Sequence, residues 1–396
     1  MSLPIQGKGS LSLKKIAIIG ASYLQNPLIL KAKELGYETH VFAWECGDIG
    51  EKTADYFYPI SIVEKERILS KCREIGIDGV CSIGSDLANT VVSYIASSMG
   101  LVSNTIEATR LSTDKHAMRD AFEKNGDPSP KSMVVDKGFC LVDSGLQFPI
   151  IVKPADRSGS RGITKLESAD RFEEAVERAK NESFSGVVLA EEFFQGNEYS
   201  VEYISWKGKH YFLSITEKFT SGAPMFIEKG HLEPARVSAS IEMKVKCVVE
   251  HALDGLGVEY GASHSELKIN EDGEIAIIEI GSRMGGDRIG SDLVSLSTGY
   301  DFVASVVAVA MGQCPALPKI EEHKYAAIRY VFDNKDLSAL DALKKNAPNL
   351  LLKADVSGFG EHAIVDSSSR FGYFMMCADS IADLSPYLPD HSEEGL

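Results

Sequence analysis

The chain has 396 residues, of which 44% are hydrophobic and 25% charged, and its formal net charge is −16. This composition is typical of a soluble globular protein, and at roughly 150 residues per domain the length predicts two or three domains. The negative charge argues against nucleic-acid binding because no domain-wide basic surface can form. The longest uncharged apolar run, Phe302 to Met311, is shorter than the roughly 18 residues of a membrane span and predicts a buried helix. Seven cysteines without a CxxC pair, and an N-terminus unlike a signal peptide, favour a cytoplasmic protein with reduced thiols.

The first hundred or so residues alternate strand and helix patterns, which predicts a parallel sheet with crossover helices. A nicotinamide-binding domain is disfavoured, because the G-x-G-x-x-G fingerprint is missing after Gly20. Gly84 and Ser85 follow a predicted strand at the sheet edge where ligands bind in such folds. The expected strands are 15–20, 39–43 and 79–83, and the expected helices are 27–35 and 89–98.

Two lysines in the middle of the chain stand where an anion could bind. A helix N-cap cluster at 112–114 places Lys115 in the first turn of a helix over 115–125, where the helix dipole disfavours a cation. Such a lysine is either solvated or directed toward an anion. Lys153 ends a short apolar strand and is followed by proline. The next loop, 157–162, combines glycine and serine with two arginines, which suits a phosphate-covering flap but is also common in plain turns.

A hairpin is predicted further along, with Asp272-Gly273 as a two-residue turn between alternating runs. Residue 271 would then face 274, and Glu266 would face Glu279 with Cβ atoms about 5 Å apart. Facing carboxylates repel unless a cation lies between them, and oxygen ligands of this kind suit Mg²⁺. The alternative is a register slipped by one residue, with both glutamates solvated. The residues expected on the core face are Leu267, Ile269, Ile278 and Ile280.

Six motifs in chain order resemble the ATP-grasp superfamily over about residues 14–316. They are a lysine at a helix start, strand-Lys-Pro with a Gly/Ser loop, Glu191-Glu-Phe-Phe194, Gly196-x-Glu198, the two hairpin glutamates and a final arginine. The resemblance implies an α/β and α+β fold. Its expected parts are a Rossmann-like pre-ATP-grasp domain (1–112), a two-lobed ATP-grasp domain (113–316) with a mobile lid at about 128–190, and a C-terminal α+β unit (317–396).

The resemblance also implies roles for individual residues toward ATP and Mg²⁺, with Mn²⁺ as an alternative metal. Glu191 would accept from the adenine amino group, and Glu198 would hold the ribose hydroxyls. Arg283 would stabilise negative charge on an acylphosphate. The remaining assignments are Lys115 and Lys153 to the phosphates, Ser158, Gly159, Ser160 and Gly162 to the closing loop, the backbone of Phe193 and Phe194 to the adenine edge, and Glu266 and Glu279 to the metal.

One position departs from the family pattern. An asparagine usually follows the second metal glutamate by two residues, and this chain has Gly281 there. Glycine has no ligating side chain, so Ser282, a backbone oxygen or water would have to serve if two metals bind.

Further segments resemble the branch that contains dipeptide-forming amino-acid ligases. That branch places a histidine two residues before the metal glutamate, as His264 is here. It also has an E-x-G-H-x-x-P segment like the one from Glu228 to Pro234, which includes His231. It also has an Arg-x-Gly-Gly loop. By this resemblance, Arg288 and the Gly285-Gly286 backbone would grip a substrate carboxylate, which guanidinium binds bidentately.

The function implied is an ATP-dependent ligase that activates a carboxylate as an acylphosphate, releases ADP and phosphate, and joins it to an amine, with an amino acid as the expected substrate. Alternatives are a ligase similar to glycinamide ribonucleotide synthetase or carbamoyl-phosphate synthetase, and an ATP-binding protein without catalysis. The expected partners are small carboxylates and amines, with no nucleic acid or membrane. A homodimer is expected by analogy with the superfamily.

Overall fold

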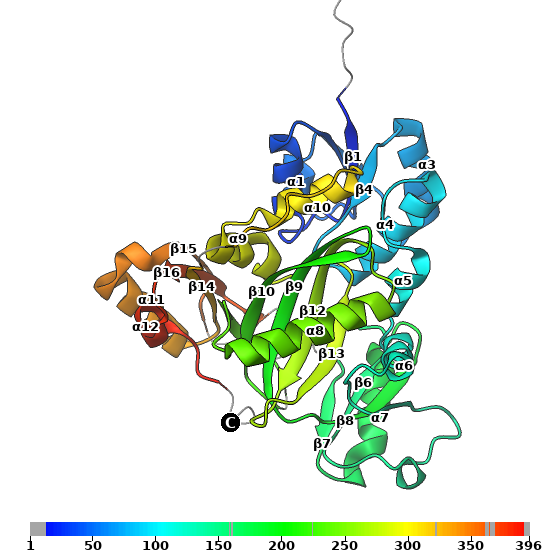
Figure 1. Cartoon of the computed structure of the whole chain (residues 1–396), viewed down its shortest axis with the longest axis vertical. Helices are drawn as coiled ribbons and strands as arrows, with labels where there is room; N and C mark the ends of the chain where they lie inside the picture. The colour runs from blue at the N-terminus through cyan, green and yellow to red at the C-terminus, as the bar shows by residue number, and fades with distance from the viewer. Residues whose placement is uncertain are drawn as a thin grey trace, which may run out of the picture.

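The described strands form three sheets, and Figure 1 labels many of their strands. The structure is a computed structural model that describes residues 13–157, 159, 161–223, 225–320, 323–360, 364 and 369–391. The strand orders are β3-β2-β1-β4, β5-β8-β6-β7 and β13-β12-β9-β10-β11-β14-β16-β15. Among the described residues, no helix is both long enough and apolar enough to cross a membrane.

The N-terminal sheet is parallel, as predicted. Its helix α4 begins at Asp86, earlier than expected, because the Ser85 side chain caps it by accepting from the Ala88 N–H (3.2 Å). The strands are β1 (Lys15–Ile19), β2 (Glu38–Ala43), β3 (Tyr56–Pro59) and β4 (Gly79–Cys81). The helices are α1 (Asn26–Glu34), α2 (Ile49–Thr53), α3 (Lys65–Ile75), α4 (Asp86–Met99) and α5 (Ile106–Leu111).

Helix α6 (Lys115–Asn125) leads from this domain into a small antiparallel sheet. Asp114 caps α6 by accepting from the His116 and Ala117 N–H groups (2.9 and 3.0 Å), so the predicted helix start is confirmed. The small sheet lies at the lower right of Figure 1, covered by α7. Its elements are β5 (Ser132–Val134), η1 (Leu141–Asp143), β6 (Ile150–Pro154), β7 (Thr164–Leu166), η2 (Ala169–Arg171), α7 (Phe172–Glu182) and β8 (Val188–Glu192).

The eight-stranded sheet is antiparallel throughout its described pairs, and α8 packs across one face of it (Figure 1). Strands from the end of the chain extend the same sheet, because β14 pairs with β11. The strands are β9 (Asn197–Trp206), β10 (Lys209–Thr220), β11 (Glu228–Glu233), β12 (Tyr260–Ile269), β13 (Ile275–Gly281), β14 (Tyr325–Val331), β15 (Leu351–Val356) and β16 (Gly372–Ala378). The helical elements are α8 (Ala239–Gly255), the π-helical η3 (Ile289–Leu293), α9 (Val294–Thr298), α10 (Phe302–Ala310), α11 (Asn334–Asn346), η4 (Pro348–Leu350), α12 (Ile381–Leu384) and η6 (Ser385–Tyr387).

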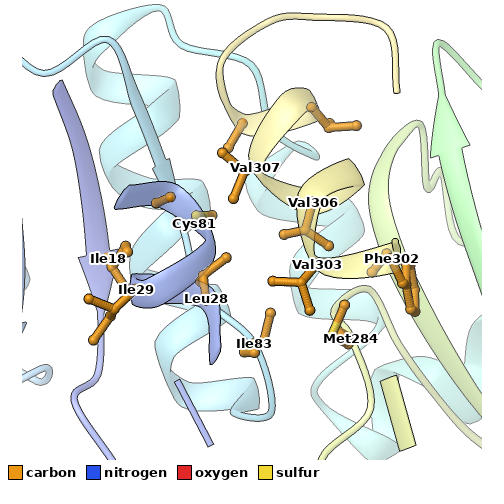
Figure 2. Close-up of a cluster of buried hydrophobic side chains, with 14 of the residues drawn as sticks. Ile18, Leu28, Ile29, Cys81, Ile83, Met284, Phe302, Val303, Val306 and Val307 are labelled. Atoms are coloured by element: carbon orange, nitrogen blue, oxygen red, sulfur yellow. The ribbon is translucent and has the colours of Figure 1, made fainter. Parts of the chain in front are cut away.

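Helix α10, which the apolar run predicted, joins the N-terminal sheet to the large sheet. Figure 2 shows its Val303, Val306 and Val307 side chains near Leu28 and Ile83, within one buried cluster. The approach is close: a Cβ on Gly79 of β4 would lie 2.5 Å from the Ala310 carbonyl oxygen. This core fixes the loop after β4 opposite the end of β13, where the Gly84 N–H donates to the Met284 carbonyl (3.1 Å).

The hairpin brings Glu266 and Glu279 face to face, as predicted, but its turn differs from the prediction. The Asn270 N–H donates to the Glu274 carbonyl (3.1 Å), so the turn spans 271–273 instead of two residues. Pairs close to the turn are therefore shifted by one residue from the predicted register.

A β-bulge restores the predicted register at the glutamates. Leu267 pairs with Ile277, and Ile278 is the extra residue of the bulge. Leu267, Ile269 and Ile280 are buried as predicted. Ile278 is not: it lines the cavity described below, and the fully buried Ile277 takes its place in the core.

Candidate active site

A cavity of ≈ 370 Å³ lies between the small sheet, the large sheet and the N-terminal domain. It collects charged side chains from elements that are far apart in the sequence. Those that line it include Asp86, Lys115, Lys153, Glu191, Glu198, Lys218, Glu228, His264, Glu266, Lys268, Glu279, Arg283 and Asp287.

The facing glutamates are each paired with a buried lysine. Lys115 Nζ donates to Glu279 Oε1 (2.9 Å), and Lys218 Nζ donates to Glu266 Oε1 (2.9 Å). Burial alone would lower the pKa of Lys115, but Glu279 raises it. The lysines thus neutralise two carboxylates that would otherwise repel each other. Paired carboxylate oxygens that open into a cavity are also the ligand type that hard divalent cations prefer.

Lys153 and Glu191 form a buried pair on neighbouring strands of the small sheet. Lys153 Nζ lies 2.5 Å from Glu191 Oε2, and Arg119 Nε of α6 lies 2.9 Å from Glu191 Oε1. Burial lowers the pKa of Lys153 to about 8, against the opposing effect of Glu191. Burial raises the pKa of Glu191, but Arg119 and Lys153 outweigh it and bring the value to about 2. Near neutral pH the charge of Lys153 is therefore sensitive to a nearby anion.

Phe193, Phe194 and Glu198 line the cavity beside this pair. Lys268 Nζ lies 4.3 Å from the Phe193 ring centroid and 3.4 Å from Glu198 Oε1. The Phe193 N–H is bonded to the Pro149 carbonyl (2.9 Å), so that group already has a partner within the small sheet.

Arg283 is clamped by an acid from the N-terminal domain. Its Nε and Nη2 donate to the two carboxylate oxygens of Asp86, at 2.7 and 3.0 Å. Burial opposes ionisation of Asp86, yet Arg283 holds the pKa of this carboxyl below its usual range. The bidentate pair ties the start of α4 to the end of β13.

The end of the cavity away from Glu191 is acidic. Glu228, His231 and Asp287 bring ligand-type atoms within 4.8 Å of one another. Arg370 binds both oxygens of Asp287 (3.0 and 2.7 Å) and lies 3.5 Å from the Tyr330 ring centroid. Burial raises the pKa of Glu228. His231 itself is fully buried behind these carboxylates and is not part of the lining.

The predicted carboxylate grip is only partly assembled. Gly286 lines the cavity, whereas Gly285 and Arg288 are not among its lining residues. The Arg288 guanidinium lies 4.4 Å from the Tyr373 ring centroid and 3.5 Å from Asp292 Oδ2. Arg288 is thus engaged outside the cavity.

The predicted closing loop reaches the cavity through Gly159. Gly162 packs elsewhere: its φ is +71°, and a Cβ there would lie 3.1 Å from Pro154 Cγ. Ser158 and Ser160 lie outside the described residues.

Ser282, a candidate to replace the missing family asparagine, is not among the residues that line the cavity. Its Oγ is bonded to Ser112 Oγ (2.7 Å) and receives the Asn89 amide (3.1 Å), and the residue is buried away from the cavity lining. Gly281 itself does line the cavity, and a Cβ on it would lie 3.2 Å from Arg283 Cζ. A larger residue at this position would crowd the clamped arginine.

His264 lies in the cavity wall next to Glu266, on the same face of β12. Its Nδ1 is bonded to the buried Glu202 of β9, and its Nε2 lies 3.3 Å from Glu266 Oε1. Burial alone would lower the pKa of His264, but Glu202 raises it to about 9. The second oxygen of Glu202 accepts the Gly285 N–H (3.4 Å), which links this strand pair to the loop after β13.

Sequence reasoning missed several charged residues of the site: Asp86, Arg119, Glu202, Lys218, Lys268, Asp287 and Arg370. Lys218 carried little signal, because it stands in a strand between Glu217 and Phe219 with a threonine on either side of this triplet. The others depend on contacts between distant segments, such as Asp86 with Arg283 and Arg370 with Asp287.

Comparison with known proteins shows what this chain is similar to. The family model for the ATP-grasp domain matches residues 146–292, which run from the small sheet to η3. The chain contains an ATP-grasp domain. The predicted mixed fold, with a parallel N-terminal sheet and antiparallel sheets in the ATP-grasp lobes, is confirmed.

Individual proteins similar to this chain are named as ligases. Alanine–anticapsin ligase of Bacillus subtilis (strain 168) is 26% identical over 245 residues, which cover 56% of this chain and 51% of that protein. The chain thus spans about half the length of this curated relative. The solved L-amino acid ligase of Bacillus licheniformis superposes with a TM-score of 0.78 at 21% identity, covering 94% of this chain and 95% of that one. Phosphoribosylglycinamide synthetase of Anaerococcus prevotii gives 0.74 at 21% identity, covering 94% and 96%.

Proposed function

We propose that this chain is an ATP-dependent ligase that joins a small carboxylate to an amine, with an amino acid as the carboxylate. The observation that carries the proposal is the facing pair Glu266 and Glu279 in one cavity with the buried Lys115 and Lys153. Two carboxylates for a divalent cation and two lysines for phosphate oxygens are what phosphoryl transfer from ATP requires. The ATP-grasp match and the ligase relatives support the same conclusion.

The nucleotide would lie along the small sheet. Lys115 and Lys153 would bind its phosphates, and Phe193 and Phe194 would contact the base. Glu191 would receive the adenine amino group beside Lys153. Glu198 would accept the ribose hydroxyls, with Lys268 held against it. The loop at Gly159 would cover the phosphates.

The donor set fits Mg²⁺ or Mn²⁺, because Glu266 and Glu279 offer only oxygen ligands and line the cavity. When bound, the metal would neutralise the phosphate oxygens and orient the γ-phosphoryl group for in-line transfer. To receive it, Glu279 must release Lys115, and this lysine then becomes free to turn toward the phosphates.

The reaction would proceed in two balanced steps. A substrate carboxylate oxygen forms a bond to the γ-phosphorus as the bond to ADP breaks, which yields an acylphosphate. The amine then adds to the acyl carbon, the bond to phosphate breaks, and the nitrogen loses a proton. Arg283 would face the negative charge that develops on the acyl group. The acidic end formed by Glu228, with His231 behind it, would hold a cationic amino group, with the Gly286 backbone beside it.

Two other functions remain in competition. A ligase that uses phosphoribosylamine with glycine, or bicarbonate with ammonia, has the same nucleotide chemistry, and the likeness to phosphoribosylglycinamide synthetase favours the first of these. A nucleotide-binding protein without catalysis is favoured by Gly281 in place of the family asparagine.

The test is release of ADP and phosphate from Mg²⁺-ATP with amino acids offered singly and in pairs. Phosphoribosylamine with glycine, and bicarbonate with ammonia, are tested in separate reactions. The Glu279→Gln variant is the matched inactive control. ADP formed only with a particular pair would support the amino-acid ligase and name its substrates. AMP instead of ADP would overturn the acylphosphate mechanism, and ATP binding without any product would favour the non-catalytic protein.

A further inference from the structure

Lys218 is a buried cation of the cavity to which the proposed nucleotide site gives no role. It stands on β10, its side chain is 4% exposed, and it lines the cavity. Its Nζ lies 2.9 Å from Glu266 Oε1 and 2.9 Å from Glu228 Oε1. It therefore bridges a proposed metal carboxylate and the acidic end of the cavity.

This bridge is incompatible with a divalent cation at Glu266. Two like charges about 4 Å apart repel each other strongly even at an effective dielectric constant near 20. Lys218 would therefore leave Glu266 and keep Glu228, its other partner. An ammonium group has three N–H donors, so at least one would then point into the space between the two carboxylates.

That space is where the reacting carboxylate must lie. It has to touch the γ-phosphoryl group held next to Glu266 and Glu279, and its carbon has to stay open to attack by the amine. Arg283 is another cation of the cavity, but its two shortest side-chain bonds go to Asp86, which is not one of the proposed metal ligands. Asp86 thus keeps neutralising Arg283, whereas Lys218 loses one of its two carboxylates.

We propose that Lys218 is a further catalytic residue, which binds the carboxylate that becomes activated; this rests on the proposed function. One carboxylate oxygen attacks phosphorus, while the other stays hydrogen-bonded to Lys218 Nζ and becomes the carbonyl oxygen of the acylphosphate. When the amine adds, that oxygen takes the negative charge from the C=O bond. It returns the electron pair as phosphate leaves, and the nitrogen loses a proton to water. A preorganised cation at this oxygen positions the carboxylate in the first step and stabilises the transition state of the second, where negative charge develops on it.

The first test measures metal binding without turnover. Free Mn²⁺ is counted by electron paramagnetic resonance in titrations of the wild type, Lys218→Met and Lys268→Met. Lys218→Met removes the cation that competes for Glu266, so the apparent Kd for Mn²⁺ should fall about fivefold or more. Lys268→Met removes another cavity lysine, whose ion-pair partner is Glu198. The Kd of this variant for Mn²⁺ should stay at the wild-type value. Equal Kd values for Lys218→Met and the wild type would overturn the role of Lys218.

The second test separates the carboxylate from ATP in steady-state kinetics. The probe is a mixture of all common L-amino acids with Mg²⁺-ATP, and ADP release is measured. Lys218→Met should raise the half-saturating concentration of the mixture about 30-fold, the cost of one lost charged hydrogen bond, with little change in KM for ATP. Lys218→Arg should recover part of the loss, and Lys268→Met should raise KM for ATP instead.

The outcomes of the second test are distinguishable. An unchanged response to the amino-acid mixture in Lys218→Met, or an equal rise in KM for ATP, would overturn the carboxylate contact. No ADP release by the wild type itself would overturn the proposed function, and the Mn²⁺ titration would still decide whether Lys218 competes with a metal.

Discussion

Lys153 is predicted to make nucleotide binding weaken as the pH rises above neutrality. Its side chain is 6% exposed and faces Glu191 on β8, and Arg119 and Lys115 on α6. Burial lowers its pKa from 10.5 to about 8. Phosphate oxygens next to Nζ favour the charged form, so the pKa in the nucleotide complex is higher. Binding above pH 8 therefore takes up a proton and becomes less favourable as protons become scarce.

The size of this effect follows from the pKa of Lys153, which is about 8 in the free protein. If the nucleotide raises that pKa above about 10, the Kd for ADP should increase about tenfold between about pH 7 and pH 9, or about 1.4 kcal/mol. At about pH 8.5, about 0.75 proton should be taken up per nucleotide bound. Calorimetry in buffers of different ionisation enthalpy measures both quantities.

The matched variant is Lys153→Arg, because a guanidinium stays charged throughout this range and its Kd should be flat. Lys153→Met, which carries no charge, should bind weakly with an equally flat profile. A flat wild-type profile, or the same slope in Lys153→Arg, would refute the assignment of this titration to Lys153.

Three further predictions concern the charged residues. Glu266→Gln and Glu279→Gln should each reduce ADP release about a hundredfold or more while circular dichroism stays native; full activity in both would refute the metal site. Arg119→Met should lower the free energy of unfolding by about 3–5 kcal/mol because it leaves Glu191 with Lys153 alone, while the exposed control Arg171→Met should not move the denaturation midpoint. His391 and Arg236 outweigh burial and hold the pKa of Glu217 at about 2, so it adds stability above pH 4.5 that is lost as the pH falls toward 2. Glu217→Gln should remove about 3 kcal/mol of that acid dependence in denaturation series, and an unchanged acid profile would contradict it.

The hairpin shows how far local pattern carries a prediction. Alternation and an Asp-Gly pair located the two strands, and the facing of Glu266 and Glu279 is confirmed. The prediction was wrong about the turn, which spans 271–273 instead of two residues, and it did not include the compensating bulge at Ile278. A bulge leaves little trace in the alternation of polar and apolar residues. Two errors of one residue cancelled at the glutamates. Residues closer to the turn retain the shift, which is why Ile277 and not Ile278 is in the core.

Long-range contacts set the limit on the rest of the site. Arg370 precedes β16, yet it binds Asp287 because β14 and β16 extend the large sheet beside β11. Asp86 reaches Arg283 only because α10 fixes the N-terminal domain against the large sheet. Neither the hydrophobic periodicity of the sequence nor the spacing of its motifs predicts contacts between segments so far apart. The predicted domain boundaries stay predictions. The strands after residue 317 belong to the same sheet as β9 to β13, so the sheet itself does not mark a boundary there.

The pairing of charges explains how a chain of net charge −16 could hold a polyanion. The cations of the cavity are not displayed as a basic surface: Lys115, Lys153, Lys218 and Arg283 are each paired with a carboxylate. Removing one partner from such a buried pair is costly, so cation and anion must arrive together. A nucleotide complexed with a divalent metal meets that condition, because the metal takes the carboxylates while the phosphates take the lysines. A free phosphate would pair with the lysines but leave the carboxylates without a cation, and a free metal ion would do the reverse. The cavity therefore favours the metal–nucleotide complex over either part alone.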